Sequence, residues 1–436
     1  MRSHLFRCPI VCFFIFFAFF ACGVDEVGFP PPVDRAYYPL GLATHPDGRY
    51  LYVSNAVYDR KYNASTITVL DTYTQQYLPN ATVKMGLFSG EIAIIKRACT
   101  DVARCERDYQ TFAFTSSRDQ NSLIALEVNA ELADSPRHLN CGQESALQNN
   151  PQSDRSCQGR HVITQGRTNV LPKNPFSIAV DDEGLFLTHL NPGSVSRWRF
   201  APLSDDATGI PIYDCEINYN GILAVATHPV LASAFLSNRN SPQVVISEVY
   251  PTLQGRCNLQ LKTGPQTVLS RVASDTRGIA FSADGSLLYL ANDSDRSVNI
   301  YDTSINSNGD ARRRLLKSIP TGNQVNVLRV AGLRPGETRA NQVNYQGVAQ
   351  QVIDQQGQGL IYVSLFDDSR VHVIDPNTLQ LIASIEVGRT PHDIAFMPDR
   401  QGQLKAYVSN FDQHYISVID LNPQSPTYLT KINTIR

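Results

Sequence analysis

A repeated pattern of short strands constrains the fold more than any other feature of this sequence. Residues 39–71 contain an apolar segment, an Asp-Gly turn, the string Leu-Tyr-Val-Ser-Asn and then Ile-Thr-Val-Leu-Asp. The same order returns in six further segments, three clear and three fainter: 274–302, 360–375, 391–420, 91–128, 175–200 and 223–249. The chain therefore contains seven copies of one structural unit.

Each copy predicts a four-stranded antiparallel meander, because alternating apolar strands are separated by turn residues. One such sheet cannot bury both of its faces alone, whereas radial repetition packs every sheet between two neighbours. Gly and Pro occupy 51 of the 436 positions, 26 and 25 respectively, which suits many short strands and turns. We predict an all-β fold, a single seven-bladed β-propeller of four-stranded blades over residues 36–436.

The repeat resembles a known family. The combination of Leu-Tyr-Val-x-Asn, Val-x-Val-Ile-Asp-x-x-Thr, Ile-x-Val-Gly-x-x-Pro and Ile-Ala-Phe-x-Pro-Asp is similar to the YVTN family of β-propeller repeats, most clearly over residues 359–421. The resemblance implies the propeller fold. Relatives of this family include surface-layer-like proteins, lipoproteins of unknown role, lactonase-like enzymes and haem d1-binding domains, so the likeness alone does not decide the function.

The N-terminus predicts export. Arg2 and Arg7 precede an uninterrupted apolar run from Pro9 to Ala21, which suits the hydrophobic region of a signal peptide and is short for a membrane-spanning helix. We therefore assign residues 1–21 to a signal peptide and exclude them from the fold.

The end of this apolar run resembles a bacterial lipobox. The sequence Phe-Phe-Ala-Cys-Gly places Cys22 after a small residue, and Phe19 stands where such motifs usually carry Leu. Lipidation of Cys22 would hold the protein on a membrane without a spanning helix, with residues 22–35 as anchor and Pro-rich tether. The expected location is the bacterial cell envelope, at the outer membrane. An ordinary secretory signal with an incidental cysteine is the alternative.

Six cysteines remain in the mature chain, and an even number in an exported protein indicates disulfides. They are Cys99, Cys105, Cys141, Cys157, Cys215 and Cys257. Spacing alone leaves 15 connectivities open. We favour sequential pairing, because the first two pairs would each close a short polar insertion.

Several function classes lack support in the sequence. A formal net charge of −2 and the absence of a Lys/Arg stripe argue against nucleic acid as a partner. No C-x-x-C, H-E-x-x-H, P-loop, dinucleotide or G-x-S-x-G motif occurs, so we expect no metal, no cofactor and no serine hydrolase chemistry.

A ligand site, if present, should lie at the mouth of the central channel, where loops enter the innermost strands. Alignment of the repeats places Arg277, Gln346 and His392 side by side there, with Asp393 next to His392. An arginine fork and a titratable imidazole suit an anionic or hydrogen-bonding ligand. The alternative is the hydrated polar mouth common to propellers.

Two functions remain open at this stage. The first is a non-catalytic binding or scaffolding module of the cell envelope, whose partner is an envelope protein or a glycan. The missing catalytic motifs favour it, so the sequence leans away from an enzyme. The second is a propeller enzyme, a lactonase-like or other hydrolase, with its site at the channel mouth.

Overall fold

The computed structural model describes residues 28–98, 109–143, 155–165, 170–191, 193–203, 209–239, 247–251, 259–263, 275–331, 343–345, 348–350 and 359–436. Predicted features at Cys22, Cys99, Cys105, Cys257 and Gln346 lie outside these residues. No helix in the described ranges is long and apolar enough to cross a membrane.

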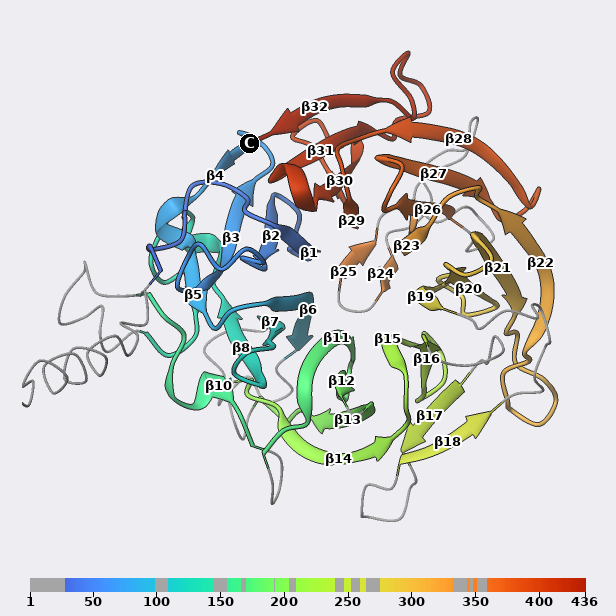
Figure 1. The fold of residues 1–436 in the computed structure, drawn as a ribbon, viewed down its shortest axis with the longest axis horizontal. Helices are drawn as coiled ribbons and strands as arrows, with labels where there is room; N and C mark the ends of the chain where they lie inside the picture. Colours follow the sequence, from blue (N-terminus) through green and yellow to red (C-terminus); the bar gives the residue numbers. More distant parts are fainter. Residues whose placement is uncertain are drawn as a thin grey trace, which may run out of the picture.

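Antiparallel four-stranded sheets follow one another around a central axis (Figure 1). The first contains β1 (Pro39–Thr44), β2 (Tyr50–Asn55), β3 (Ser65–Asp71) and β4 (Gln76–Tyr77), with β5 (Val83–Met85) beside β3. The second contains β6 (Ser89–Ala98), β7 (Tyr109–Ser117), β8 (Ser122–Val128) and β10 (Val162–Ile163), with β9 (Leu139–Asn140) also beside β8. The third contains β11 (Lys173–Asp181), β12 (Gly184–Asn191), β13 (Ser194–Arg199) and β14 (Ile212–Asn218).

The remaining sheets repeat this order. They contain β15 (Ile222–Thr227), β16 (Ala234–Asn238), β17 (Ser247–Pro251) and β18 (Leu259–Thr263); β19 (Thr276–Phe281), β20 (Leu287–Asn292), β21 (Ser297–Asp302) and β22 (Arg314–Pro320); β23 (Val325–Ala331), β26 (Leu360–Leu365), β27 (Arg370–Asp375) and β28 (Gln380–Glu386); and β29 (Pro391–Pro398), β30 (Leu404–Asn410), β31 (Tyr415–Asp420) and β32 (Lys431–Ile435). The prediction of an all-β propeller of four-stranded antiparallel blades is confirmed.

The first strand of each sheet lies innermost. β1, β6, β11, β15, β19, β23 and β29 contact one another in that order, and β29 contacts β1, so the ring is closed. A two-stranded hairpin, β24 (Val343–Tyr345) with β25 (Val348–Gln350), follows β23 and contacts β1, β6 and β29, which places it inside the ring (Figure 1). Short 3-10 turns lie at Pro79–Ala81, Ala130–Leu132, Gly159–His161 and Phe411–Gln413.

The hydrophobic core consists of layers between neighbouring sheets. The aromatic and leucine side chains of the second strands are buried, as the repeat predicts: Tyr52, Phe112, Leu187, Phe235, Tyr289, Tyr362 and Tyr407. One layer joins the two ends of the chain, because Leu42 and Val53 pack in one cluster with Ala395, Tyr407 and Val418. Burial of these layers provides the main stabilisation of the ring.

Within the segment predicted as a tether, the described residues from Gly28 onward lie against the first blade. Phe29 and Tyr62 form a parallel bridge, the Thr82 hydroxyl donates to the Val33 carbonyl at 3.0 Å, and Ala36 is fully buried. The chain is therefore held against the ring from Phe29 onward.

Two of the predicted disulfide cysteines are joined in the structure. Cys141 and Cys157 form a disulfide that closes an insertion after β8. Cys215 is disulfide-bonded as well.

Candidate functional site

A β-bulge lies near the start of every innermost strand and determines which side chains reach the channel. The register shifts between Pro39 and Gly41 in β1, and at the equivalent point in β6, β11, β15, β19, β23 and β29. A bulge leaves one residue of the strand unpaired and re-aims its neighbours. The bulge therefore repeats as regularly as the strands do.

In each innermost strand, the residue that follows the last pair before the bulge stands at the channel mouth. These residues are Leu40, Gly90, Phe176, Leu223, Arg277, Asn326 and His392. Six of these seven positions agree with the sequence alignment. The exception is Gln346, because the innermost strand of that sheet is β23 and Asn326 occupies the position expected for Gln346.

In several blades, the next residue along the innermost strand approaches a backbone N–H of the following blade. The Asp393 carboxylate accepts the Leu42 N–H at 3.0 Å, and the Ser177 hydroxyl accepts the Val225 N–H at 3.3 Å. Where Gly41 occupies this position, the neighbouring backbone comes so close that an added Cβ would lie 2.9 Å from the Ile92 nitrogen. Polar side chains here thus satisfy buried N–H groups.

Two residues further along, six innermost strands carry alanine and one carries arginine. The alanines are Ala43, Ala93, Ala179, Ala226, Ala280 and Ala395, and the exception is Arg329 in β23. Each of these residues lines the central cavity. A single cation therefore projects into a channel that is otherwise lined by methyl groups at this level.

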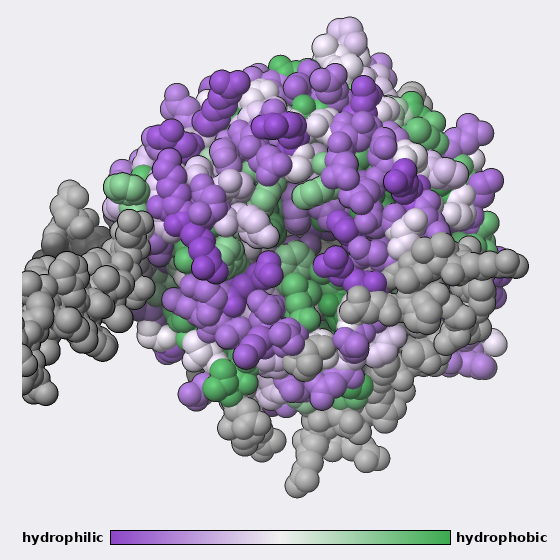
Figure 2. All heavy atoms as spheres, viewed as in Figure 1, coloured by the Kyte–Doolittle hydropathy of each residue, from purple (hydrophilic) through white to green (hydrophobic). Residues whose placement is uncertain are grey.

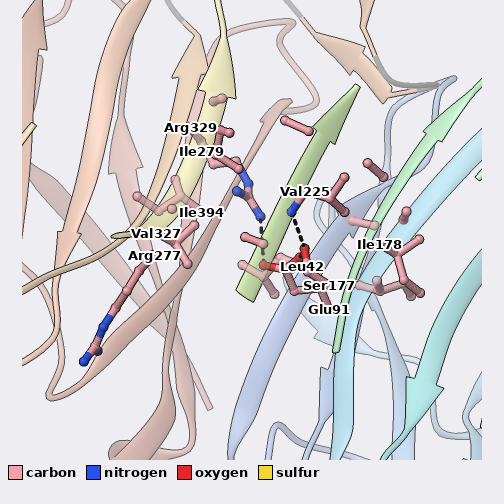
Figure 3. A pocket seen from close by; sticks show the side chains of 18 of the residues that line it. Leu42, Glu91, Ser177, Ile178, Val225, Arg277, Ile279, Val327, Arg329 and Ile394 are labelled. Atoms are coloured by element: carbon pink, nitrogen blue, oxygen red, sulfur yellow. Dashed lines mark hydrogen bonds and ion pairs between the residues drawn. The ribbon is translucent and has the colours of Figure 1, made fainter. Parts of the chain in front are cut away.

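Arg329 bridges the channel. Its Nη2 lies 2.9 Å from Asp393 Oδ1 on the next blade and 3.9 Å from Glu91 Oε1 on the second blade. Figure 3 shows the guanidinium directed towards Glu91, with Ser177 beside that carboxylate. Asp393 is 2% exposed, so the closer pair is strongly shielded on its acidic side.

Glu91 is the most perturbed acid of this cluster. Burial raises the pKa of Glu91 above its ordinary value, and the positive charge of Arg329 opposes part of that rise. The Ser177 hydroxyl donates to Glu91 Oε2 at 2.6 Å, a short bond of the kind made to a charged acceptor. A carboxyl group in this setting can exchange a proton nearer to neutral pH than an exposed one.

At the mouth, Arg277 is neutralised by two acids. Its Nη2 lies 3.1 Å from Asp275 Oδ2 and 3.0 Å from Asp293 Oδ2, and Arg239 also pairs with Asp275. The Arg277 side chain points away from the Arg329 cluster (Figure 3). A ligand anion would therefore have to compete with two resident carboxylates for Arg277.

His392 stands on the mouth as expected from the sequence, in its neutral form near pH 7. Burial lowers the pKa of His392 to about 4, and its buried Nδ1 has no hydrogen-bond partner among the described residues. The imidazole lies beside the Phe411 ring, with 6.3 Å between the ring centroids. Such a neutral imidazole can donate or accept one hydrogen bond from a ligand.

The structure divides the predicted site residues into two groups. Asp393 joins the channel cluster, whereas Arg277 belongs to a separate charged network on the rim. Sequence reasoning missed Arg329, Glu91 and Ser177. The signal for Arg329 was available, because it is the arginine at a position where the other repeats carry alanine.

The channel encloses a cavity of about 220 Å³ that these polar groups line together with aliphatic side chains. Figure 2 shows the hollow at the centre of the molecule, with hydrophobic residues inside it and hydrophilic residues around its rim. The volume lies below the roughly 300–1,000 Å³ of pockets for drug-sized ligands, so the cavity suits a molecule the size of one sugar. Among the described residues, no group of three His, Cys, Asp or Glu side chains could hold a metal ion.

No protein-family model matches the chain. No curated protein sequence matches it either. The YVTN resemblance therefore stays a prediction.

Solved structures resemble the whole ring. A protein from Bacteroides fragilis assigned as a candidate 6-phosphogluconolactonase has a TM-score of 0.56 and 12% identity, and covers 95% of this chain and 97% of its own. A candidate 6-phosphogluconolactonase from Bacteroides uniformis has a TM-score of 0.51 and 14% identity, and the match covers 81% of this chain and 86% of its own. Hydrazine synthase from Kuenenia stuttgartiensis has a TM-score of 0.53 and 12% identity, and the match covers 93% of this chain and 100% of its own. At these identities the likeness establishes the fold alone.

Proposed function

We propose that the protein is an exported, lipid-anchored propeller of the bacterial cell envelope that binds a small polyhydroxylated ligand, such as one sugar unit of a glycan, in its central channel without transforming it. The observation that carries this proposal is the cross-channel cluster of Arg329, Asp393 and Glu91 inside a cavity of about 220 Å³.

A polyhydroxylated ligand matches the chemistry of the cavity better than a simple anion does. Arg329 offers donors, Glu91 offers acceptors, and His392 and Asn326 add neutral polar groups at the mouth. The two acids of the cluster already compensate the positive charge of Arg329. Sugar hydroxyls can bond to donors and acceptors at once, and their carbon-bound faces can lie against the alanine and isoleucine walls.

Export is supported by the sequence and by the cysteines. The apolar run of residues 9–21 ends at the lipobox-like Cys22, and the Cys141–Cys157 disulfide agrees with an oxidising compartment. The ring is consistent with seven blades, which we infer from the closed circuit of innermost strands from β1 to β29.

A lactonase-like hydrolase is the second candidate, and one specific observation favours it. The raised pKa of Glu91 and its contact with Ser177 suit a general acid or base, and the Arg329 guanidinium could stabilise an oxyanion in the same cavity. Candidate lactonases among the structural neighbours are consistent with this alternative.

Calorimetric titration with glucose, galactose and N-acetylglucosamine tests the binding proposal on the mature protein. We expect one of these sugars to bind, and Arg329→Ala to weaken its binding at least tenfold. Arg296→Gln, at an exposed arginine in the turn between β20 and β21, is the control and should bind as the wild type does. Absence of binding by all three sugars would contradict the proposal.

Hydrolysis of glucono-δ-lactone, followed with a pH indicator, separates the two candidates. A rate above the uncatalysed reaction that Glu91→Gln abolishes would establish the hydrolase. Sugar binding without lactone hydrolysis would leave the binding function in place.

A further inference from the structure

Arg118 lies on the rim of the channel, outside the cluster described above. It opens the turn between β7 and β8, and its backbone N–H donates to the Phe88 carbonyl at 3.2 Å. Its guanidinium carbon lies over the Phe176 ring, 5.9 Å from the centroid. Since Phe176 lines the central cavity, Arg118 is one aromatic ring away from the channel.

Arg118 forms no ion pair and no side-chain hydrogen bond with any residue in the described part of the chain. Its Nε is buried and unpartnered, whereas its two terminal nitrogens are not fully buried and are therefore accessible. The neighbouring Asp119 instead accepts the Ser117 hydroxyl at 2.6 Å. Burial lowers the pKa of Arg118, and the group that opposes this is the phenol of Tyr58 rather than a carboxylate.

Three other shielded arginines of the ring are paired with acids. Arg197, 3% exposed, lies 2.8 Å from Asp181, and Arg277 and Arg329 have the partners described above. A partly buried cation without a counter-ion loses hydration and gains no Coulomb energy in return. A bound anion would supply the counter-ion that Arg118 lacks among the described residues.

The surroundings of Arg118 are aromatic and preorganised. Tyr58 lies beside Phe88, with 6.0 Å between their ring centroids, and the Arg60 guanidinium lies 5.1 Å above the Phe88 ring. Val57, which is fully buried, has a φ of 47°. That backbone conformation is rare for a β-branched residue, and it presents Tyr58 on the surface, where it is 62% exposed.

We propose that Arg118, together with Tyr58, Phe88 and Phe176, forms a subsite for an oxyanion, a carboxylate or a phosphate ester, carried by a ligand that lies against the aromatic rim. The two accessible terminal nitrogens form the fork that binds such a group in a bidentate manner. The rings provide flat apolar surfaces for the rest of the ligand. The subsite goes beyond the proposed function, because it requires neither channel occupancy nor catalysis.

The test compares glucuronate, glucose 6-phosphate, inorganic phosphate and neutral glucose by titration at low ionic strength, which also separates the carboxylate from the phosphate source. We expect at least one anionic sugar to bind tenfold or more tightly than glucose. Arg118→Gln should remove that advantage, whereas Arg296→Gln, in the equivalent turn of another blade, should retain it. Equal binding of charged and neutral sugars by the wild type, no anion binding at all, or full anion binding by Arg118→Gln would each overturn the proposal.

Two further measurements guard against misleading results. Arg118→Met should unfold at a temperature equal to or above that of the wild type, because it removes an uncompensated charge; marked destabilisation would instead indicate a structural role and overturn the proposal. Inorganic phosphate should still bind to Arg329→Ala, which lacks the channel cation. If Arg329→Ala loses sugar binding but still binds phosphate, the result bears only on the proposed binding function of the channel and leaves the Arg118 subsite in place.

Discussion

Asp393 joins three blades through one carboxylate: its Oδ1 lies 2.9 Å from Arg329 Nη2 on the preceding blade, and its Oδ2 accepts the Leu42 N–H of the first blade at 3.0 Å. The last blade consists entirely of residues from the C-terminal end of the chain, and the first blade of residues from the N-terminal end. Among the described strands none is exchanged between these two blades, so side-chain contacts hold the ring closed. The Ser409 hydroxyl, which donates to the Leu40 carbonyl at 3.4 Å, adds to this junction.

Replacement of Asp393 by alanine should therefore destabilise the ring. The change leaves a buried N–H without an acceptor and Arg329 without its nearest counter-ion, for which we expect a loss of about 3–5 kcal/mol in the free energy of unfolding. Chemical denaturation measures it. Asp393→Asn keeps an acceptor for the Leu42 N–H, so it should lose less than Asp393→Ala; equal losses would show that the hydrogen bond contributes little.

Substitution of Gly41 by alanine tests how closely neighbouring innermost strands approach. The new Cβ would lie 2.9 Å from the Ile92 nitrogen and 3.0 Å from the Glu91 Cα, both backbone atoms that cannot move independently. We expect a loss of about 2–3 kcal/mol, in the range of overpacked cores. Gly159→Ala, where no atom of the described residues lies within 4 Å of the added Cβ but φ is 61°, should lose only about 1 kcal/mol of stability from backbone strain. A similar cost at both positions would contradict close packing of the ring.

The Cys141–Cys157 disulfide should stabilise the folded protein by closing an insertion. The two residues are 16 positions apart, and a loop of this length corresponds to about 3 kcal/mol in the chain-entropy treatment. The Cys141→Ser, Cys157→Ser double variant should lower the free energy of unfolding by that amount. Digestion by trypsin under native conditions, followed by mass spectrometry, should then cut the insertion first; unchanged stability and cleavage would indicate that packing alone holds it.

The sequence alone was enough to predict the repeated strands, but not the side chains that meet in the channel. The buried tyrosines Tyr52, Tyr289, Tyr362 and Tyr407 mark the second strands as expected, because alternation of apolar residues reports burial directly. The first strand of the sixth sheet was misplaced near Gln346, since an insertion separates β23 from its partner β26 and hides the repeat spacing. Arg329 departs from the alanine that the other innermost strands carry at its position, and Glu91 lies on another blade. Their meeting depends on ring closure across blades, which local patterns do not encode.

Acid should destabilise the protein through its buried histidines, and His189 offers the clearest case. Its Nδ1 donates to the Pro172 carbonyl at 3.1 Å and its Nε2 accepts the Ser196 hydroxyl at 2.9 Å, so the neutral ring is fully bonded. Burial lowers the pKa of His189 from 6.5 to about 4. Between pH 6.5 and 4 the imidazole is therefore protonated in the unfolded chain and neutral in the folded protein. The stabilisation present above pH 6.5 is lost as the pH falls towards 4.

The expected contribution of His189 is about 3 kcal/mol, from 1.36 kcal/mol per unit of pKa. His189→Gln removes this titration, so the pH dependence of its unfolding free energy between pH 6.5 and 4 should be shallower than that of the wild type by that amount. Proton NMR of the His189 ring in the wild type provides the direct check. A ring that titrates near pH 6.5 in the folded protein would contradict the prediction, since the folded and unfolded states would then take up the proton alike.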